Sequence, residues 1–328
     1  MGTRCGLRSL MHRLVIFAFV MAATLSGQSS QPSGNSTDQP SQKWNPPSSW
    51  VDSYRNATIS FGRVVEDHGQ RLFQVVGTGI FIAIVANGES HLFLVTAKHM
   101  FYESSLSWHP TSLQVRFASE EKESQTEQLG APVQLRNANG DDLWLSPLDG
   151  ADIAALRISA SQFQQLSTHD GRLFAIPISN LADPDDIYDG ASILVLGYPG
   201  LVGNSTLVRA ITRGGYIAWT DPSGASTHPF LIDATILPGN SGGPVIKFPN
   251  GIRRDGGSVM GDKAKLLGIV SQDISQRYEV TADGKVVKVQ SSAMSPPSVA
   301  EVQFTGVGAI GKVEPAPELK RFLLSLVH

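Results

Sequence analysis

The chain has 328 residues, of which 41% are hydrophobic and 17% charged, and its formal net charge is −3 at pH 7. This length suits two packed lobes better than one small domain. The composition is that of a globular protein and excludes a disordered or wholly membrane-embedded chain. No long basic run occurs, so the sequence gives no indication of a nucleic-acid partner.

Residues 1–27 have the pattern of an export signal. Arg4, Arg8 and Arg13 precede the uncharged run LVIFAFVMAATL at 14–25, and small residues follow at which a signal peptidase could cut. A membrane-spanning helix needs about 20 apolar residues, and this run has 12. We therefore expect cleavage rather than an uncleaved anchor, a secreted or periplasmic protein, and no stable membrane insertion after cleavage.

The only cysteine, Cys5, lies inside the predicted signal peptide. The mature chain is therefore expected to contain no thiol, no disulfide and no cysteine-based metal site. No H-E-x-x-H motif occurs either, so neither a metal nor another cofactor is expected. Residues 28–50 are rich in Ser, Gln, Pro and Asn and are predicted to be a flexible tether. The sequence does not predict an oligomeric state.

Short β-like runs separated by Gly, Pro, Asn and Asp fill most of the remaining chain, which we treat as one domain at 51–328. The first six runs are 57–65, 71–85, 91–97, 113–117, 131–136 and 152–158, and the second six are 191–198, 206–219, 229–236, 243–248, 265–272 and 278–289. Six strands, a loop-rich stretch and six more strands predict an all-β fold of two tandem six-stranded antiparallel β-barrels. The barrels are expected at about 57–160 and about 190–312.

Two local features complete the predicted fold. The Asp-Gly pair at 283–284 predicts a hairpin turn within the last run. Residues 317–327 place Leu319, Phe322, Leu323 and Leu326 at helical spacing after a proline. This spacing predicts a short C-terminal helix packed on the second barrel.

The string LPGNSGGPV at 237–245 is the strongest chemical signal, because it places Ser241 on a tight, glycine-rich turn. Gly239 can adopt backbone conformations that turn its N–H inward. The N–H groups of Gly239 and Ser241 can then converge as an oxyanion hole, which stabilises a transition state by about 3–4 kcal/mol per donor. The alternative interpretation is a glycine-rich hairpin turn with an incidental serine.

A serine nucleophile needs a base, and a base needs an orienting group. His99 follows the apolar run 93–97 and is the candidate base. Asp152 directly precedes the apolar run DIAALRI and is the candidate that would hold the imidazole. Asp149 is its competitor. The remaining histidines are interpreted as structural or exposed, namely His91, His109, His169 and His228.

The motifs TAKH, DIAAL and GNSGGP, in this order, resemble those of the trypsin/chymotrypsin-like serine peptidases over roughly residues 70–325. DATILPGNSGGPVI at 233–246, LLGIVSQD and GVGAIGKVEP at 306–315 resemble the bacterial exported branch, which includes periplasmic heat-shock-type proteases. The resemblance implies two β-barrels with His99, Asp152 and Ser241 in the cleft between them. Unlike that branch, this chain has Lys98 before the histidine, and we expect no protein-binding module after the barrels. A surface loop of unassigned role is expected at 249–264.

The same resemblance implies a substrate pocket. Its floor would be Thr235, beside Ile236, and its walls would come from the stretch that contains Gly268, Val270 and Ser271, together with 307–309. No aspartate occupies the floor, so a preference for Lys or Arg is not expected. Small or medium apolar side chains are the predicted substrates of this pocket.

The resulting hypothesis is a serine endopeptidase that cleaves polypeptides through an acyl-enzyme intermediate. A catalytically inactive barrel pair used for binding is the main alternative, and a protein that cleaves only itself is another. An α/β-hydrolase esterase does not fit, because its triad follows the order Ser, Asp, His and its serine precedes a helix.

Overall fold

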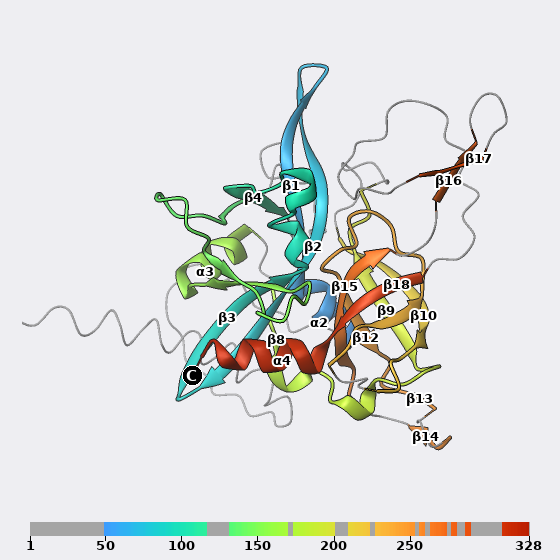
Figure 1. Ribbon diagram of the computed structural model, residues 1–328. Coiled ribbons are helices and arrows are strands. Elements are labelled where there is room, and N and C mark those ends of the chain that lie inside the picture. The colour runs from blue at the N-terminus through green and yellow to red at the C-terminus, as the bar shows by residue number, and fades with distance from the viewer. Residues whose placement is uncertain are drawn as a thin grey trace, which may run out of the picture.

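The computed structural model describes residues 49–116, 131–169, 173–200, 209–223, 227–252, 256–259, 263–273, 277–280, 286–289 and 310–327. Within these ranges the chain is mostly β-strand and forms two lobes, coloured blue to green and yellow to red in Figure 1. The all-β fold class predicted from the sequence is confirmed. The predicted signal peptide and most of the predicted tether lie outside the described residues.

The first lobe is one antiparallel sheet in the order β5-β4-β1-β2-β3-β7-β6, with β8 paired to β2. Its strands are β1 (Thr58–Asp67), β2 (Gln70–Ala86), β3 (Glu89–Thr96), β4 (Ser112–Arg116), β5 (Ala131–Gln134), β6 (Trp144–Leu145), β7 (Ala154–Ile158) and β8 (Ile176–Pro177). The pairings among the described residues run from β5 to β6 without closing into a ring. The first lobe is therefore a half-barrel rather than the predicted closed six-stranded barrel, and it has eight strands, two of which, β6 and β8, contain only two residues.

Two-residue turns explain how the long strands of this lobe fold back. His68 and Gly69 have φ of 48° and 77°, and Asn87 and Gly88 have φ of 53° and 76°. Two successive residues with positive φ match the right-handed twist of the strands that they join. The first turn ends the β1–β2 hairpin, which projects from the body of the molecule at the top of Figure 1.

The second lobe is a closed barrel in the order β10-β11-β18-β15-β12-β9. Its strands are β9 (Ser192–Gly197), β10 (Ile211–Trp219), β11 (Phe230–Asp233), β12 (Pro244–Lys247), β15 (Lys265–Asp273) and β18 (Ile310–Pro315). Five of them match predicted runs. The sixth prediction was wrong, because 278–289 forms a separate hairpin of β16 (Arg277–Val280) and β17 (Val286–Val289).

The sixth place in the barrel belongs to β18, which pairs with both β11 and β15. Val313 of β18 is fully buried. The backbone hydrogen-bonding groups on both edges of its strand are paired, with β11 on one side and β15 on the other. A hairpin such as β16–β17 satisfies one edge of each strand by itself and does not need a place in the barrel. Its predicted turn at 283–284 lies outside the described residues.

The stretch 249–264, which was predicted to be a surface loop, contains a small hairpin of β13 (Gly251–Ile252) and β14 (Ser258–Val259).

Within the described ranges, three α-helices accompany the sheets: α2 (Trp50–Ala57), α3 (Ala160–His169) and α4 (Ala316–Ser325). The C-terminal helix was predicted and is confirmed, with Leu319 and Leu323 fully buried. Helix α2 was not predicted, and it bridges the lobes: it leads into β1, while its Tyr54 hydroxyl donates to the Ala264 carbonyl at 3.2 Å. Helix α3 occupies part of the stretch predicted to be loop-rich. None of the helices in the described ranges is long and apolar enough to cross a membrane.

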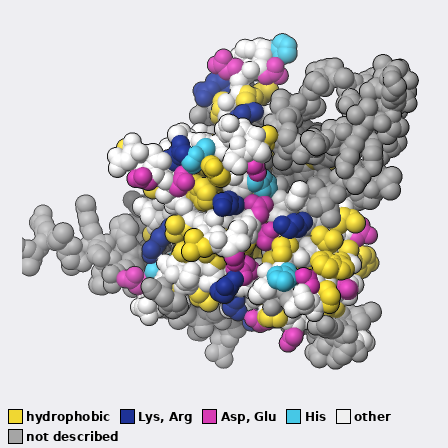
Figure 2. Space-filling view, viewed as in Figure 1, with side chains coloured by type: hydrophobic (Ala, Val, Ile, Leu, Met, Phe, Trp, Pro, Cys, Tyr) yellow, Lys and Arg dark blue, Asp and Glu magenta, His cyan; other side chains and the backbone are white. Residues whose placement is uncertain are grey.

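Side chains of β2 alternate between two cores, as successive residues of a strand must. Phe81 and Ala83 belong to the core of the first lobe. Ile80, Ile82 and Ile84 belong to a second cluster that continues through the barrel of the second lobe. Because β2 contributes to both cores, the two lobes pack as one unit. Charged side chains of both signs are interspersed on the face shown in Figure 2.

Candidate active site

His99 and Asp152 are brought together by the pairing of two strands. β3 ends at Thr96, and the short 3-10 helix η1 (Lys98–Met100) that follows carries His99. Asp152 lies two residues before β7, and Thr96 pairs with Ala154 at the start of that strand. Asp152 Oδ2 lies 2.8 Å from His99 Nδ1, and Asp152 Oδ1 accepts from the His99 backbone N–H at 3.0 Å. The carboxylate thus fixes both the ring and the backbone of His99.

The surroundings of Asp152 favour its charged form. Burial raises the pKa of this carboxyl, but the side-chain hydrogen bond from His99, the charge of His99 and its backbone N–H together outweigh burial, and Lys312 adds to them. The pKa of Asp152 is therefore below its usual value. An ionised carboxylate accepts from Nδ1–H, which leaves the other ring nitrogen of His99 able to accept a proton.

Asp149, the alternative candidate, does not contact His99. Its Oδ1 accepts from the Ala151 backbone N–H at 3.1 Å, and its Oδ2 lies 3.4 Å from Arg321 Nη2. Asp149 therefore shapes the turn before Asp152 and is tied to helix α4.

The loop that carries Ser241 is a tight turn that only glycine permits at two positions. Gly239 has φ of +95°, and a Cβ there would lie 2.4 Å from the Tyr198 carbonyl oxygen. Gly242 has φ of +81°, and its Cβ would lie 2.0 Å from the Thr78 carbonyl oxygen. Both positions combine a conformation that side chains disfavour with a close approach of another backbone. The GNSGGP string is thus explained by backbone geometry.

Thr78 of β2 anchors this loop through two hydrogen bonds and accepts a third from Tyr198. Its backbone N–H donates to the Ser241 carbonyl at 2.8 Å, and its hydroxyl donates to the Gly239 carbonyl at 2.7 Å. The same hydroxyl accepts from the Tyr198 N–H at 3.0 Å. Thr96 is next to this anchor, because its hydroxyl donates to the Thr78 carbonyl at 2.7 Å. The Ser241 loop is therefore docked against the strand end that leads, three residues later, into His99.

The backbone around Ser241 also has unpaired donors. Within the part of the chain that the structure describes, the N–H groups of Gly239 and Ser241 donate to no other group, whereas those of Asn240, Gly242 and Gly243 are all bonded. Two unpaired N–H groups on one tight turn, flanking a bonded one, are what an oxyanion hole requires. The Asn240 side chain is directed away from solvent and packs over Gly197, where a Cβ would lie 2.8 Å from its Oδ1.

Of the residues predicted to line the substrate pocket, Ile236 has the clearest placement. It is 4% exposed, and it packs on Gly311 of β18, where a Cβ would lie only 2.6 Å from its Cγ1. Thr235 is exposed, and its carbonyl accepts from Arg213 Nη1 at 2.6 Å. Neither Gly311 nor Arg213 was predicted as a site residue, since no motif distinguishes them from other strand residues.

The remaining predicted pocket residues lie on β15. Val270 exchanges backbone hydrogen bonds with the Ser241 loop, accepting from Gly242 N at 2.7 Å and donating to the Gly243 carbonyl at 2.9 Å. Gly268 is a buried strand position against the Glu314 carbonyl of β18. Ser271 is 2% exposed, and its hydroxyl lies 3.4 Å from the Lys312 carbonyl. These three residues support the Ser241 loop and β18, and residues 307–309 lie outside the described residues.

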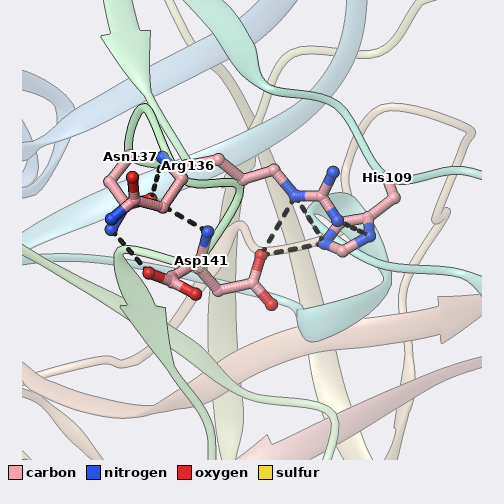
Figure 3. Close-up of polar contacts among 6 residues, drawn as sticks. His109, Arg136, Asn137 and Asp141 are labelled. Carbon is pink, nitrogen blue, oxygen red and sulfur yellow. Dashed lines mark hydrogen bonds and ion pairs between the residues drawn. The ribbon is translucent and has the colours of Figure 1, made fainter.

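Other histidines have structural partners. His109 lies between Arg136 and Asp142, with Asp142 Oδ1 2.8 Å from its Nε2, in the polar cluster drawn in Figure 3. His91 contacts Arg157, and His228 contacts Asp221. In the described ranges no three His, Cys, Asp or Glu side chains are grouped so that they could bind a metal ion. The side chain of His169 lies outside the described residues.

A family model of the trypsin-like peptidase domain matches residues 77–251, which is more than half of the chain. The chain belongs to this family. The matched range contains His99, Asp152 and Ser241, so the contacts between Asp152 and His99 and the bonds from Thr78 to the Ser241 loop lie inside the matched peptidase domain.

Searches of known proteins give two further findings. No curated protein matches this chain. Solved structures similar to it include the serine endoprotease from Yersinia pestis, at 16% identity and a TM-score of 0.41 over 86% of this chain and 68% of that one. They also include an HtrA-type protease determined with a decapeptide, at 16% identity and a TM-score of 0.41 over 85% and 68% of the two chains.

Proposed function

We propose that this peptidase domain is a serine endopeptidase in which Ser241 is the nucleophile, His99 the general base and Asp152 the orienting acid. One pair of observations carries the proposal. Asp152 contacts His99 at two atoms. The loop of Ser241 is bonded to Thr78 of β2, whose carbonyl accepts from Thr96, three residues before His99. The unpaired N–H groups of Gly239 and Ser241 support the same assignment, because they are donors for a developing oxyanion.

The mechanism follows from these roles. His99 takes the proton of the Ser241 hydroxyl as its oxygen attacks the scissile carbonyl, and Asp152 stabilises the resulting imidazolium. The N–H groups of Gly239 and Ser241 stabilise the oxyanion. His99 then protonates the leaving amine, and a water molecule hydrolyses the acyl-enzyme by the same steps. No cofactor takes part in this scheme.

The proposed substrates are polypeptides with a small or medium apolar side chain before the cleaved bond. Supporting this preference, Ile236 is an apolar residue beside Gly311, and the neighbouring position 235 has a threonine rather than an acid. A carboxylate in the pocket would be needed to select Lys or Arg. Cleavage of a peptide library, read by mass spectrometry, tests this preference, and a majority of cuts after Lys or Arg would contradict it.

We also propose that the protein is exported through residues 1–27 and acts outside the cytoplasm, in the periplasm or the medium. The charged start and the short apolar run support this location. N-terminal sequencing of the protein from a bacterial expression host tests it. A new N-terminus near residue 27 is expected, and an intact Met1 would contradict export by cleavage.

Hydrolysis of an unstructured protein such as casein tests the activity. Wild-type protein should hydrolyse it, and Ser241→Ala should abolish hydrolysis. Ser53→Ala is the matched control, because Ser53 lies on α2, where its hydroxyl bonds only within the helix. Hydrolysis that persists in Ser241→Ala would contradict the proposal, and its absence from folded wild-type protein would favour a binding role.

A further inference from the structure

The segment that joins β11 to β12 carries the predicted floor of the substrate pocket at one end and Ser241 at the other. The floor residues are Thr235 and Ile236. Thr78 holds the other end of the segment, through the carbonyls of Gly239 and Ser241. A different contact is therefore needed to hold the floor.

The strand ladders of the barrel stop before they reach Thr235. β10 begins at Ile211, but its pairing with β11 ends at Tyr216 and Asp233. The pairing of β11 with β18 ends at Asp233 as well. The Thr235 carbonyl lies beyond both ladders, so its hydrogen-bond partner has to come from elsewhere.

Arg213 of β10 supplies that partner. Its Nη1 donates to the Thr235 carbonyl at 2.6 Å. Arg213 pairs with Val195 of β9, so the two side chains leave the sheet on the same face. Val195 is 1% exposed, which identifies this face as the interior of the barrel. A hydrogen bond from a charged donor is about twice as strong as a neutral one, so this contact is a firm anchor for the floor.

The guanidinium of Arg213 is not explained by an ion pair. Burial is the cause that lowers the pKa of Arg213, and no charged neighbour contributes. In the part of the chain that the structure describes, this guanidinium has no carboxylate partner. A partly buried cation is costly unless it is hydrogen-bonded. The bond to the Thr235 carbonyl therefore accounts for the position of the Arg213 side chain.

Arg213 and Thr78 hold the segment at separate points. Between them, the Pro238 carbonyl accepts from the Gly200 N–H at 2.8 Å. The turn around Ser241 thus has backbone bonds of its own that do not involve Arg213. Loss of the Arg213 contact is expected to displace the floor and to leave the Ser241 loop in place.

We propose that Arg213 is a positioning residue for the substrate pocket: it holds the Thr235 carbonyl and, with it, the floor at Thr235 and Ile236. The inference rests on the proposed function, because it concerns the pocket of the same site. Arg213 differs in role from Thr78, since it affects which side chain the pocket accepts rather than the reactivity of Ser241.

Four variants of the full chain test this role: Arg213→Met, Arg213→Gln, Arg213→Lys and Arg63→Met. Arg213→Met removes every donor, Arg213→Gln has a shorter polar side chain, and Arg213→Lys keeps a charged donor without the planar fork. Arg63→Met is the matched control, because Arg63 is also a strand arginine, and its side chain donates to Gln74 at 2.8 Å on the β1–β2 hairpin.

Amide NMR spectra test the anchor itself and do not depend on activity. The Ile236 nitrogen belongs to the same peptide group as the Thr235 carbonyl, so its resonance reports on the partner of that carbonyl. This resonance should move in Arg213→Met and Arg213→Gln, whereas the Gly242 resonance should stay in place. An unmoved Ile236 resonance, or an equal movement of the Gly242 resonance, would overturn the proposal.

Kinetics test the pocket. Two peptides that differ only in the residue before the cleaved bond, valine or glycine, report on the floor. Labelling of Ser241 by a fluorophosphonate probe without a peptide portion reports on the reactivity of the serine. In Arg213→Met the valine-to-glycine ratio of kcat/KM should fall about tenfold, the size of one lost pocket contact, while the labelling rate should stay within about twofold.

Arg213→Lys should have a ratio between those of wild type and Arg213→Met, and Arg63→Met should match wild type. An unchanged ratio in Arg213→Met, or a labelling rate that falls as far as kcat/KM, would overturn the positioning role. If Arg213→Met does not fold, Arg213→Gln takes its place with the same expected direction.

The two proposals fail in different ways. A failure of the proposed function would appear as folded wild-type protein that is neither labelled nor active, and the Ile236 resonance then decides whether Arg213 holds the segment. A failure of the positioning role would appear as an active wild-type protein whose Arg213→Met variant keeps the wild-type ratio.

Discussion

Asp152 contacts His99 at two atoms, 2.8 Å from the ring Nδ1 and 3.0 Å from the backbone N–H. The second contact holds the backbone of His99, so Asp152 fixes both the backbone and the ring of the proposed base. Because the backbone of His99 follows directly from β3, this pair also ties β3 to the turn before β7. The orientation of the base is therefore set by the fold of the first lobe.

Asp152→Asn should lower kcat by about 10⁴-fold while leaving the fold intact. An amide can donate to Nδ1, which selects the wrong tautomer of His99. Peptide hydrolysis followed over a range of substrate concentrations measures the loss. Asp149→Asn is the control, and it should retain activity within about twofold, because Asp149 touches only Ala151 and the exposed Arg321. Equal losses in both variants would contradict the assignment of Asp152.

Thr78→Val should destabilise the protein and slow catalysis together. The substitution leaves the buried Gly239 carbonyl and Tyr198 N–H without their partner, at a cost of about 1–3 kcal/mol for each group. Thr58→Val is the matched control, since Thr58 is equally buried and its hydroxyl donates only to the Tyr54 carbonyl. Denaturant unfolding and kcat/KM measure the two effects. A Thr58→Val variant that lost as much activity as Thr78→Val would argue against a specific role of Thr78.

Gly242→Ala should abolish activity, and it should destabilise the fold as well. Its Cβ would lie 2.0 Å from the Thr78 carbonyl oxygen and 2.1 Å from Thr96 Oγ1, so the Ser241 loop must move. Gly88→Ala is the control: it has a similar φ of +76° but nothing within 4 Å of its Cβ. It should lose only about 1 kcal/mol of stability and retain activity. Normal activity of Gly242→Ala would show that the loop is not held as described.

Asp186→Asn should destabilise the protein at neutral pH but not in acid. Burial raises the pKa of Asp186, but hydrogen bonds from Lys265, from the Asp183 backbone and from Lys247 outweigh burial and place this pKa below its usual value. A carboxyl with a lowered pKa stabilises the fold above its usual value of about 4, and this stability is lost as the pH falls through the lowered pKa.

Thermal unfolding measured from pH 7 down through the acid range follows this dependence. At pH 7 the midpoint of Asp186→Asn should fall below that of wild type, because two Lys side chains 2.7 and 3.0 Å away lose their anion. The two proteins should converge once the pH has fallen below the lowered pKa of Asp186. Asp185→Asn, at an exposed neighbouring position, should match wild type throughout. A difference that stays constant with pH would indicate a packing effect instead.

The sequence predicted the fold where local patterns decide it. Alternating apolar runs located the strands, and Leu319, Phe322 and Leu323 located the C-terminal helix. It failed where pairing partners are distant: β18 replaced 278–289 in the barrel because Val313 finds buried partners on both sides. Helix α2 was missed because its anchoring contact, from Tyr54 to Ala264, spans 210 residues.

The residues proposed to carry the chemistry were easier to predict from the sequence than the residues that hold them in place. Ser241 and its glycines stand in one string, and backbone geometry restricts Gly239 and Gly242 to glycine. Thr78 has no such signal, because a threonine on a strand is common in any barrel. Only the folded chain brings it to the Ser241 loop.

Covalent labelling with a fluorophosphonate probe is the most direct test of the central claim, because the probe reacts with a serine only when a base activates it. Wild-type protein should be labelled at Ser241, as located by peptide mass spectrometry, and labelling should be lost in Ser241→Ala and His99→Ala and slowed in Asp152→Asn. Folded wild-type protein that remains unlabelled, or labelling that persists in His99→Ala, would contradict the account.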